Sequence, residues 1–154
     1  MSGETWKDEL RKHFAALKLI EKAKADTIES FTQFCEFIAE PAFESLEEEM
    51  KEYGVRVRFR EEKGRAIDFE LSFPGSNTDN FHYRIVLPKN AYELKLGLVL
   101  KGRKSKSVPQ EEKTSPFMKE LSPEEIMKIT KEDLIRDILG RYGDFRLSSL
   151  TSPD

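Results

Sequence analysis

The sequence is poor in the residues that form covalent cross-links and metal sites. It contains one cysteine, Cys35, and two histidines. A single cysteine excludes a disulfide within the chain, and the apolar helical pattern around Cys35 predicts a small buried hydrophobe rather than a reactive thiol. His13 and His82 lie far apart and match no metal-binding spacing. We therefore predict no metal and no cofactor.

Long apolar runs are also missing. Nowhere do about eighteen apolar residues follow one another, and the first residues do not combine a cationic start with an apolar stretch. The sequence thus indicates neither a membrane-spanning segment nor a secretion signal, and one cysteine is compatible with a reducing compartment. We expect a cytoplasmic protein without a membrane partner.

Motifs that assemble an active site are absent too. No Gly-rich phosphate loop follows a predicted strand, and neither a G-x-S-x-G elbow nor Walker or Rossmann spacing occurs. The expectation is therefore a protein that is not an enzyme. The alternative is an active site built from residues distant in sequence, for which His82, Asp68, Glu70 and Arg84 are the first candidates.

The chain is rich in charge of both signs. Charged residues make up 36% and hydrophobic residues 38% of the sequence, and the 26 basic and 29 acidic side chains are interleaved. The net charge of −3 creates no overall field that attracts nucleic acid or an anionic membrane. Because apolar residues recur in periodic blocks, we predict one folded domain over residues 1–154, with an ordered core at residues 5–100 and 122–147.

The first forty residues have the periodicity of helices. Thr5 with Asp8 forms a capping signal that predicts a helix over residues 6–24, and Asp26 with Glu29 repeats the signal for a second helix. We expect these segments to form an antiparallel hairpin packed on the domain; the alternative is one long helix that dimerises. The heptad-like apolar stripe along both segments consists of Leu10, Leu17, Ile20, Phe31, Phe34 and Ile38.

A third helix is predicted between Pro41 and Gly54. Proline suits the first turn of a helix, and glycine suits the left-handed position just after its end. The glutamates of this segment are interpreted as a solvated face rather than a metal site. Its predicted inward face consists of Phe43, Leu46, Met50 and Tyr53.

Between residues 55 and 100 the apolar period changes to two, which is typical of strands with one buried face. Short connections favour antiparallel pairing in chain order. The predicted fold is α+β, with N-terminal helices packed on one face of a four-stranded antiparallel meander and a short C-terminal helix. The inward positions of the four strands are Val55, Val57 and Phe59; Ile67, Phe69, Leu71 and Phe73; Phe81, Tyr83, Ile85 and Leu87; and Tyr92, Leu94, Leu96, Leu98 and Leu100.

The first turn suggests a register for the sheet. A three-residue loop at residues 62–64 places Phe59 opposite Ile67, and the same parity in the next pair of strands places Glu70 beside Arg84. Opposite charges then face one another on the polar side, so carboxylates and arginines are expected to form a structural ladder.

The period-two pattern does not continue beyond residue 100. Residues 101–121 combine basic residues, other charges and prolines, which predicts a mobile loop. Capping signals then predict a short turn of helix and a short C-terminal helix that ends at Gly140 and Gly143. Residues 148–154 are expected to fray.

Candidate binding residues lie on the polar side of the predicted sheet and in the basic loop after it. Rows of arginine and lysine can neutralise phosphates, which makes a nucleic-acid-binding strip one hypothesis. However, the aromatic residues have the opposite parity, so the stacking platform of sheet-based RNA binders is missing. The candidates are Arg56, Arg58, Arg60, His82, Arg84, Lys101, Arg103, Lys104 and Lys106.

The preferred function is a non-catalytic protein-interaction module or assembly subunit that associates with itself or with a protein partner. It depends on the missing catalytic set and on the heptad-like stripe, which offers more apolar helix surface than a four-stranded sheet must cover. One alternative is nucleic-acid binding through Arg56, Arg58, Arg60 and the basic residues 101–106. The other is a hydrophobic-ligand-binding domain or enzyme with a pocket between the aromatic sheet face and the helices, where ordinary core packing is the simpler interpretation.

Overall fold

The computed structural model describes residues 5–72, 80–102, 111–118 and 121–150. Residues 148–150 are described by their backbone alone. The helices are α1 (Trp6–Phe34), α2 (Glu40–Met50), α3 (Pro123–Ile126) and α4 (Lys131–Leu150), with a π-helical turn at Cys35–Ala39 and a 3₁₀ turn at Lys51–Tyr53. The strands are β1 (Arg56–Glu62), β2 (Ala66–Ser72), β3 (Phe81–Val86), β4 (Gly97–Gly102) and β5 (Glu111–Pro116).

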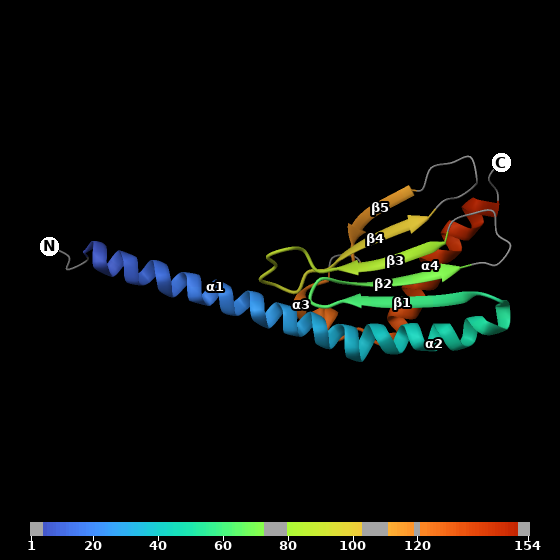
Figure 1. The fold of residues 1–154 in the computed structure, drawn as a ribbon, viewed down its shortest axis with the longest axis horizontal. Coiled ribbons are helices and arrows are strands. Elements are labelled where there is room, and N and C mark those ends of the chain that lie inside the picture. Colours follow the sequence, from blue (N-terminus) through green and yellow to red (C-terminus); the bar gives the residue numbers. More distant parts are fainter. Residues whose placement is uncertain (1–4, 73–79, 103–110, 119–120, 151–154) are drawn as a thin grey trace.

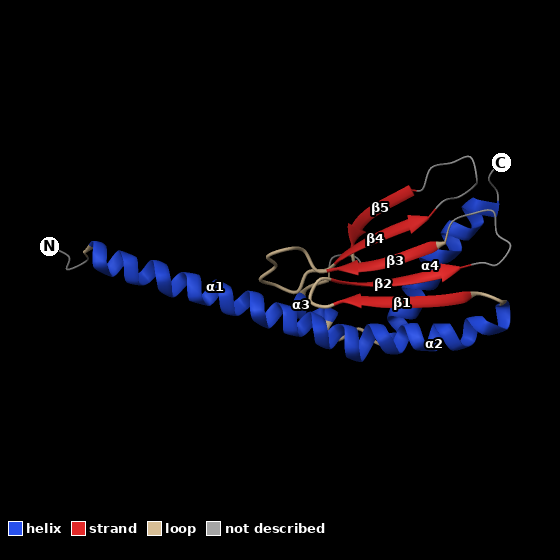
Figure 2. Cartoon of the chain, in the orientation of Figure 1, coloured by secondary structure: helices blue, strands red, loops and turns tan. Residues whose placement is uncertain are grey.

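An antiparallel sheet and helices on one of its faces form the folded body. The strands pair in chain order, β1-β2-β3-β4-β5, and α2 and α4 contact the sheet at β1 and β3 respectively. In Figure 1, α2 runs beside β1 and α4 crosses behind the strands, while most of α1 extends away from the body. The α+β class is thus confirmed, but the prediction of four strands is wrong because the sheet has five (Figure 2).

The fifth strand lies inside the segment that was expected to be a mobile loop. β5 pairs with β4 from Gly97 opposite Pro116 to Gly102 opposite Glu111. It is an edge strand, where a proline at the end and charged side chains are tolerated because one row of backbone groups needs no partner strand. Phe117 anchors its end: the side chain is buried and its ring meets that of Phe34 edge-on at 5.7 Å between centroids.

The predicted alternation of faces is right, but the predicted register is displaced by two residues. Phe59 lies opposite Phe69 rather than Ile67, because β1 continues through Glu62 and the connecting loop is centred on Gly64. Gly64 has φ of +74°, a left-handed conformation that glycine adopts without strain. A shift of two residues keeps every apolar side chain on its own face, so the core is unchanged.

The fourth strand begins later than predicted. β4 starts at Gly97, and the chain between Leu87 and Leu96 forms an irregular connection instead of a strand from Tyr92. Leu94 and Leu96 are still buried, but Tyr92 is 64% exposed, so its predicted inward position is wrong. Alternating apolar residues therefore predicted burial correctly for the leucines without requiring a strand.

The N-terminal helices form one continuous rod, and the predicted hairpin is wrong. The second capping signal, Asp26 with Glu29, lies inside α1, where Thr27 Oγ1 donates a hydrogen bond to the carbonyl oxygen of Ala23 at 2.8 Å. A threonine that bonds back to the carbonyl four residues earlier satisfies its hydroxyl inside a helix. The first capping signal is confirmed: the backbone N–H of Thr5 donates to Asp8 Oδ2 at 3.1 Å and α1 begins at Trp6.

Pro41 lies in the first turn of α2, as predicted, and the rod widens just before it by one turn of π-helix. A proline inside a helix lacks an N–H, and its ring clashes with the carbonyl oxygen four residues earlier. The turn Cys35–Ala39 relieves this conflict, since the N–H of Glu40 bonds the carbonyl oxygen of Cys35, five residues back. The rod changes direction where α1 passes into α2 (Figure 1).

The C-terminal helix is longer than predicted. α4 continues through Gly140 and Gly143 to Leu150, so it includes the first residues of the segment 148–154 that was expected to fray. Glycine in a helix interior costs about 0.5–1 kcal/mol, which side-chain packing can outweigh. Here Phe145 packs on Phe81 of β3 with ring centroids 5.1 Å apart.

The core lies between the inner face of the sheet and the helices. Its aromatic side chains contact one another: the rings of Phe43 on α2 and Phe69 on β2 are 4.7 Å apart between centroids. Tyr83 on β3 is fully buried and its hydroxyl donates a hydrogen bond to Asp137 on α4. This dense packing is what the ordinary-core interpretation expects, and the hydrophobic-ligand pocket stays a prediction. In the described part of the chain, no helix is long and apolar enough to cross a membrane.

Candidate functional site

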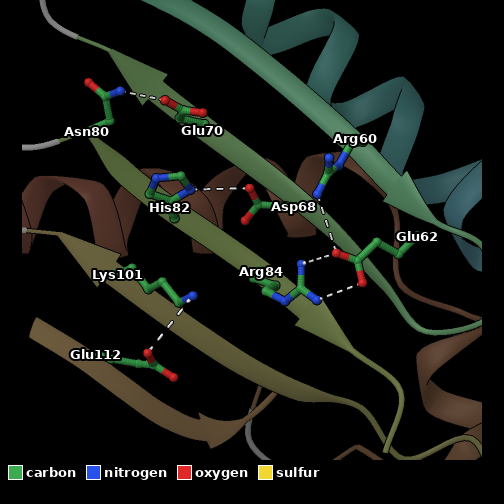
Figure 3. Close-up of polar contacts among 9 residues, drawn as sticks. All are labelled: Arg60, Glu62, Asp68, Glu70, Asn80, His82, Arg84, Lys101 and Glu112. Carbon is green, nitrogen blue, oxygen red and sulfur yellow. Dashed lines mark hydrogen bonds and ion pairs between the residues drawn. The ribbon is translucent and has the colours of Figure 1, made fainter.

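The structure brings the predicted polar residues together on the outer face of the sheet (Figure 3). One cross-strand row runs Arg58, Glu70, His82, Lys101 and Glu112, in which Arg58 faces Glu70 and Lys101 faces Glu112, while His82 lies between Glu70 and Lys101. In the next row Asp68 lies between Arg60 and Arg84. Opposite charges on facing positions stabilise strand pairing, so the predicted charge ladder exists with different partners.

His82 and Asp68 form the most enclosed polar pair of this face. His82 Nδ1 lies 3.2 Å from Asp68 Oδ2, and each side chain is 25% exposed. The hydrogen bond to Asp68 raises the pKa of His82 above its usual value, although burial and Lys101 act in the opposite direction. The predicted approach of Glu70 to Arg84 is wrong, because Glu70 instead accepts a hydrogen bond from the side-chain amide of Asn80.

Arg84 is held by a carboxylate that sequence reasoning did not assign to it. Its two terminal nitrogens donate to the two carboxylate oxygens of Glu62, at 3.2 and 3.0 Å. This paired geometry and the positive charge of Arg84 lower the pKa of Glu62. Arg60 adds a longer contact of 3.5 Å to the same carboxylate, so Glu62 ties β1 to β3 across β2.

The remaining predicted binding residues are exposed or lie outside the described residues. Arg56, Arg58 and Arg60 are exposed on the edge strand β1, and Lys101 lies 4.0 Å from Glu112. Arg103, Lys104 and Lys106 lie outside the described residues, so the structure does not show the basic loop. On the described part of this face, five basic side chains (Arg56, Arg58, Arg60, Arg84, Lys101) stand among four carboxylates (Glu62, Asp68, Glu70, Glu112). Such a balance favours a charge ladder over a phosphate-binding strip.

Among the described residues of this face, His82 is a side chain suited to proton exchange. Among the described residues, no thiol or hydroxyl is hydrogen-bonded to the second ring nitrogen of His82 to serve as a nucleophile. Cys35 is fully buried in the helical rod, and burial raises the pKa of its thiol. Within the described ranges, no group of three or more His, Cys, Asp and Glu side chains is placed to hold a metal ion.

A second surface of interest is the N-terminal part of α1, residues 6–24, which we name the projecting segment. Fourteen consecutive residues from Glu9 to Lys22 are exposed, and Thr27 is the first buried side chain of the helix. At 1.5 Å per residue the projecting segment is about 28 Å long. In Figure 1 the N-terminal part of α1 extends beyond the body.

Five of the six large apolar side chains of the projecting segment share one side. At 100° per residue these five fall within about 120° of the helix circumference, while the opposite side carries Arg11, Lys12 and Lys22 together with Asp8, two alanines and Leu19, which is 70% exposed. Exposed side chains of this size are usual singly, but a continuous stripe indicates an interaction surface. We name them the apolar stripe: Trp6 (68% exposed), Leu10 (47%), Phe14 (53%), Leu17 (40%) and Ile20 (48%).

The apolar stripe leads into a groove at the base of the projecting segment. The groove has a volume of about 460 Å³ and is bounded by Lys24 and Ile28 of α1, by Gly64 in the β1–β2 turn, and by residues 86–91 after β3. Ile28 follows Leu10 by eighteen residues, five full helical turns, so both lie on the same side of the helix. The stripe and the groove therefore form one continuous surface.

Sequence reasoning identified part of this surface and missed the rest. Leu10, Leu17 and Ile20 were assigned to a heptad-like stripe, but they were expected to pack on the domain as part of a hairpin. Trp6 and Phe14 were not assigned to it. Trp6 could have been found by the same spacing, since it precedes Ile20 by fourteen residues, or two heptads.

Comparison with known proteins gives no relative from which a function can be transferred. The chain matches no protein-family model and has no significant match among curated proteins or solved structures. The surfaces described above are therefore the basis for any functional assignment.

Proposed function

We propose that this chain is a non-catalytic protein-interaction module that self-associates through the projecting segment. The observation that carries the proposal is the apolar stripe, five large side chains exposed on one side of a helix that extends beyond the body. Leaving such a stripe in water is unfavourable, and burying it against another helix is the common solution. A surface that pairs with its own copy needs no second component.

The charge ladder on the sheet supports the non-catalytic part of the proposal. Its charged groups contact one another: Arg84 is engaged by Glu62 and His82 by Asp68. Groups that neutralise one another in this way act as cross-strand links rather than as a free acid and base. The apolar stripe of the projecting segment, with five exposed large side chains, therefore supports the proposal best.

A matched pair of substitutions tests self-association. Leu17→Lys places a charge in the apolar stripe, whereas Ala15→Lys adds the same charge two residues away, about 200° around the helix. Leu17 is 40% exposed. Completing its burial is worth about 1 kcal/mol per copy, or about 2 kcal/mol in a symmetric pair, a factor of about 30 in the dimer dissociation constant.

Sedimentation equilibrium provides the measurement. We expect the wild type and Ala15→Lys to sediment at twice 17.9 kDa at micromolar concentration and Leu17→Lys to sediment as a monomer. Circular dichroism of all three proteins controls for folding. A wild type that stays monomeric as its concentration is raised, or a Leu17→Lys variant that dimerises as well as the wild type, would defeat the proposal.

A further inference from the structure

The apolar stripe carries information about how two copies would be arranged. Its heptad positions form two series, Trp6, His13 and Ile20 in one and Leu10, Leu17 and Lys24 in the other. We name the residues of these two series the seam. In a parallel pair each seam residue meets its own copy, which would place two Lys24 ammonium groups together. In an antiparallel pair each series meets the other, and like charges are separated.

We propose that two copies pair antiparallel, in the register in which the residue numbers of facing seam positions sum to 30, and that Trp6 of each copy occupies the groove of the other. This inference rests on the proposed self-association and specifies its geometry. Leu10 then faces the partner's Ile20, His13 faces the partner's Leu17, and Trp6 faces the partner's Lys24. The same contacts repeat through the two-fold axis, as an isologous interface requires.

The residues that flank the seam agree with this register. Lys7 approaches the partner's Glu21 on one flank, and the reciprocal pair forms by symmetry, while Phe14 meets the partner's Phe14 near the axis. On the other flank Ala16 meets its own copy and Glu9 lies near the partner's Ala23. No two like charges face one another, and charge pairs at flanking positions are what select orientation in coiled coils. Among the described residues, neither Lys7 nor Glu21 has an ion-pair partner within its own chain.

The length of the projecting segment also fits. The register overlaps residues 6–24 with themselves, so the whole exposed length is used while each body begins where the partner's helix ends. Trp6 reaches Lys24 and the adjoining groove, which Ile28 and Gly64 help to line. An indole over an ammonium group is a favourable cation–π contact, and in the single copy Lys7 already lies 5.6 Å from the Trp6 ring centre. Pairing would exchange this exposed contact for one inside the groove.

Disulfide trapping tests orientation and register. Leu10→Cys and Ile20→Cys variants are mixed, one of them labelled with nitrogen-15, and oxidised. Because Cys35 is fully buried, it does not compete with the introduced thiols for disulfide formation. The proposed register predicts disulfides between the two variants in excess over disulfides within either one. A parallel pair would instead give Leu10→Cys homodimers, which would overturn the inference and leave self-association standing.

Charge reversal provides an independent test of the flanks. Lys7→Glu and Glu21→Lys are each expected to weaken dimerisation several-fold, and the double variant is expected to restore it because the pairs are re-formed with exchanged signs. Failure of the double variant to recover dimerisation while each single variant weakens it would contradict the register.

Fluorescence reports on the groove, because Trp6 is the only tryptophan in the sequence. Acrylamide should quench the Trp6 fluorescence of the wild-type dimer less than that of the Leu17→Lys monomer. Equal quenching in the two proteins would contradict the proposed position of Trp6 in the groove. Basic helices with an apolar side also bind membranes, and vesicles of phosphatidylcholine and phosphatidylserine test that alternative. A monomer that binds these vesicles through the stripe would overturn both self-association and the register.

Discussion

Replacing Tyr83 by phenylalanine removes one hydroxyl from the contact that holds α4 on the sheet. The Tyr83 side chain is fully buried on β3, and its hydroxyl donates a hydrogen bond to a carboxylate oxygen of Asp137 on α4. Arg141 lies one turn further along α4, with Nε 3.8 Å from the other carboxylate oxygen of Asp137. The substitution therefore leaves the carboxylate with a positively charged neighbour while it loses the buried donor.

The expected loss of stability follows from the charge of the acceptor. Hydrogen bonds to charged groups contribute about 1.5–3 kcal/mol, more than neutral ones. For a chain of this size each kcal/mol changes the melting temperature by about 2–4 °C, so Tyr83→Phe should lower it by about 3–12 °C. Asp137→Asn keeps an acceptor and removes its charge, and should cost less than Tyr83→Phe.

Urea unfolding followed by circular dichroism measures these differences, since a change in midpoint at constant slope reports stability alone. Alkaline pH gives a second signature: burial, and then the charge of Asp137, raise the pKa of Tyr83. The folded state thus retains the phenol proton above pH 10 where the unfolded chain releases it, so this contribution to stability is lost as pH rises above 10. A Tyr83→Phe protein within about 0.5 kcal/mol of the wild type would refute the reasoning.

Three further predictions concern other parts of the fold. Cys35 should react with a thiol reagent only as denaturant unfolds the chain, because its side chain is fully buried; rapid labelling in native buffer would contradict that burial. The raised pKa of His82 contributes stability that is present below pH 6.5 and lost as pH rises through the folded-state value, so urea titrations of Asp68→Asn should show a flatter pH dependence in that range, and an unchanged slope would count against the pair. Gly140→Ala should raise the unfolding free energy by about 0.5–1 kcal/mol, since an added Cβ meets nothing within 4 Å, and thermal unfolding that shows a loss would argue against an uninterrupted α4.

The parts of the fold that could be predicted from sequence are those in which local chemistry and tertiary packing agree. Alternating residues from Val57 to Ile85 placed the apolar face of three strands correctly, because a strand exposes side chains to its two faces in turn. β5 escaped prediction because its residues are polar on both faces. Its only strong signal is Phe117, which lies just after the strand and enters the core.

Local signals misled where the tertiary structure outweighs them. Asp26 with Glu29 predicts the start of a new helix, but α1 continues through both residues to Phe34. Gly140 and Gly143 suggest a helix end, yet packing of the α4 side chains on the sheet outweighs the cost of two glycines. The outcome for α4 depends on a contact that is distant in sequence, that of Phe145 with Phe81.

The candidate surfaces show the same division. Heptad spacing correctly groups Leu10, Leu17 and Ile20 on one side of a helix, but spacing cannot tell whether another element covers that side. The partner of Arg84 was missed because a two-residue change of register moves every facing pair while leaving the apolar pattern intact. Glu62 was assigned to the loop at residues 62–64, and its role as the partner of Arg84 follows only from the extension of β1 to Glu62.

The widened turn at Cys35–Ala39 has a consequence for the direction in which the apolar stripe points. A π turn accommodates one more residue than an α turn, and one residue corresponds to about 100° of rotation about a helix axis. Pro41→Ala with no deletion would allow α-helical bonding there and turn residues 6–24 by about a quarter of a revolution relative to the sheet, whereas the same substitution with one residue deleted would keep their direction. Pro41 therefore helps to set the direction in which the apolar stripe points relative to the sheet. Replacing it would change how the folded bodies of two paired copies are oriented without changing any residue of the stripe.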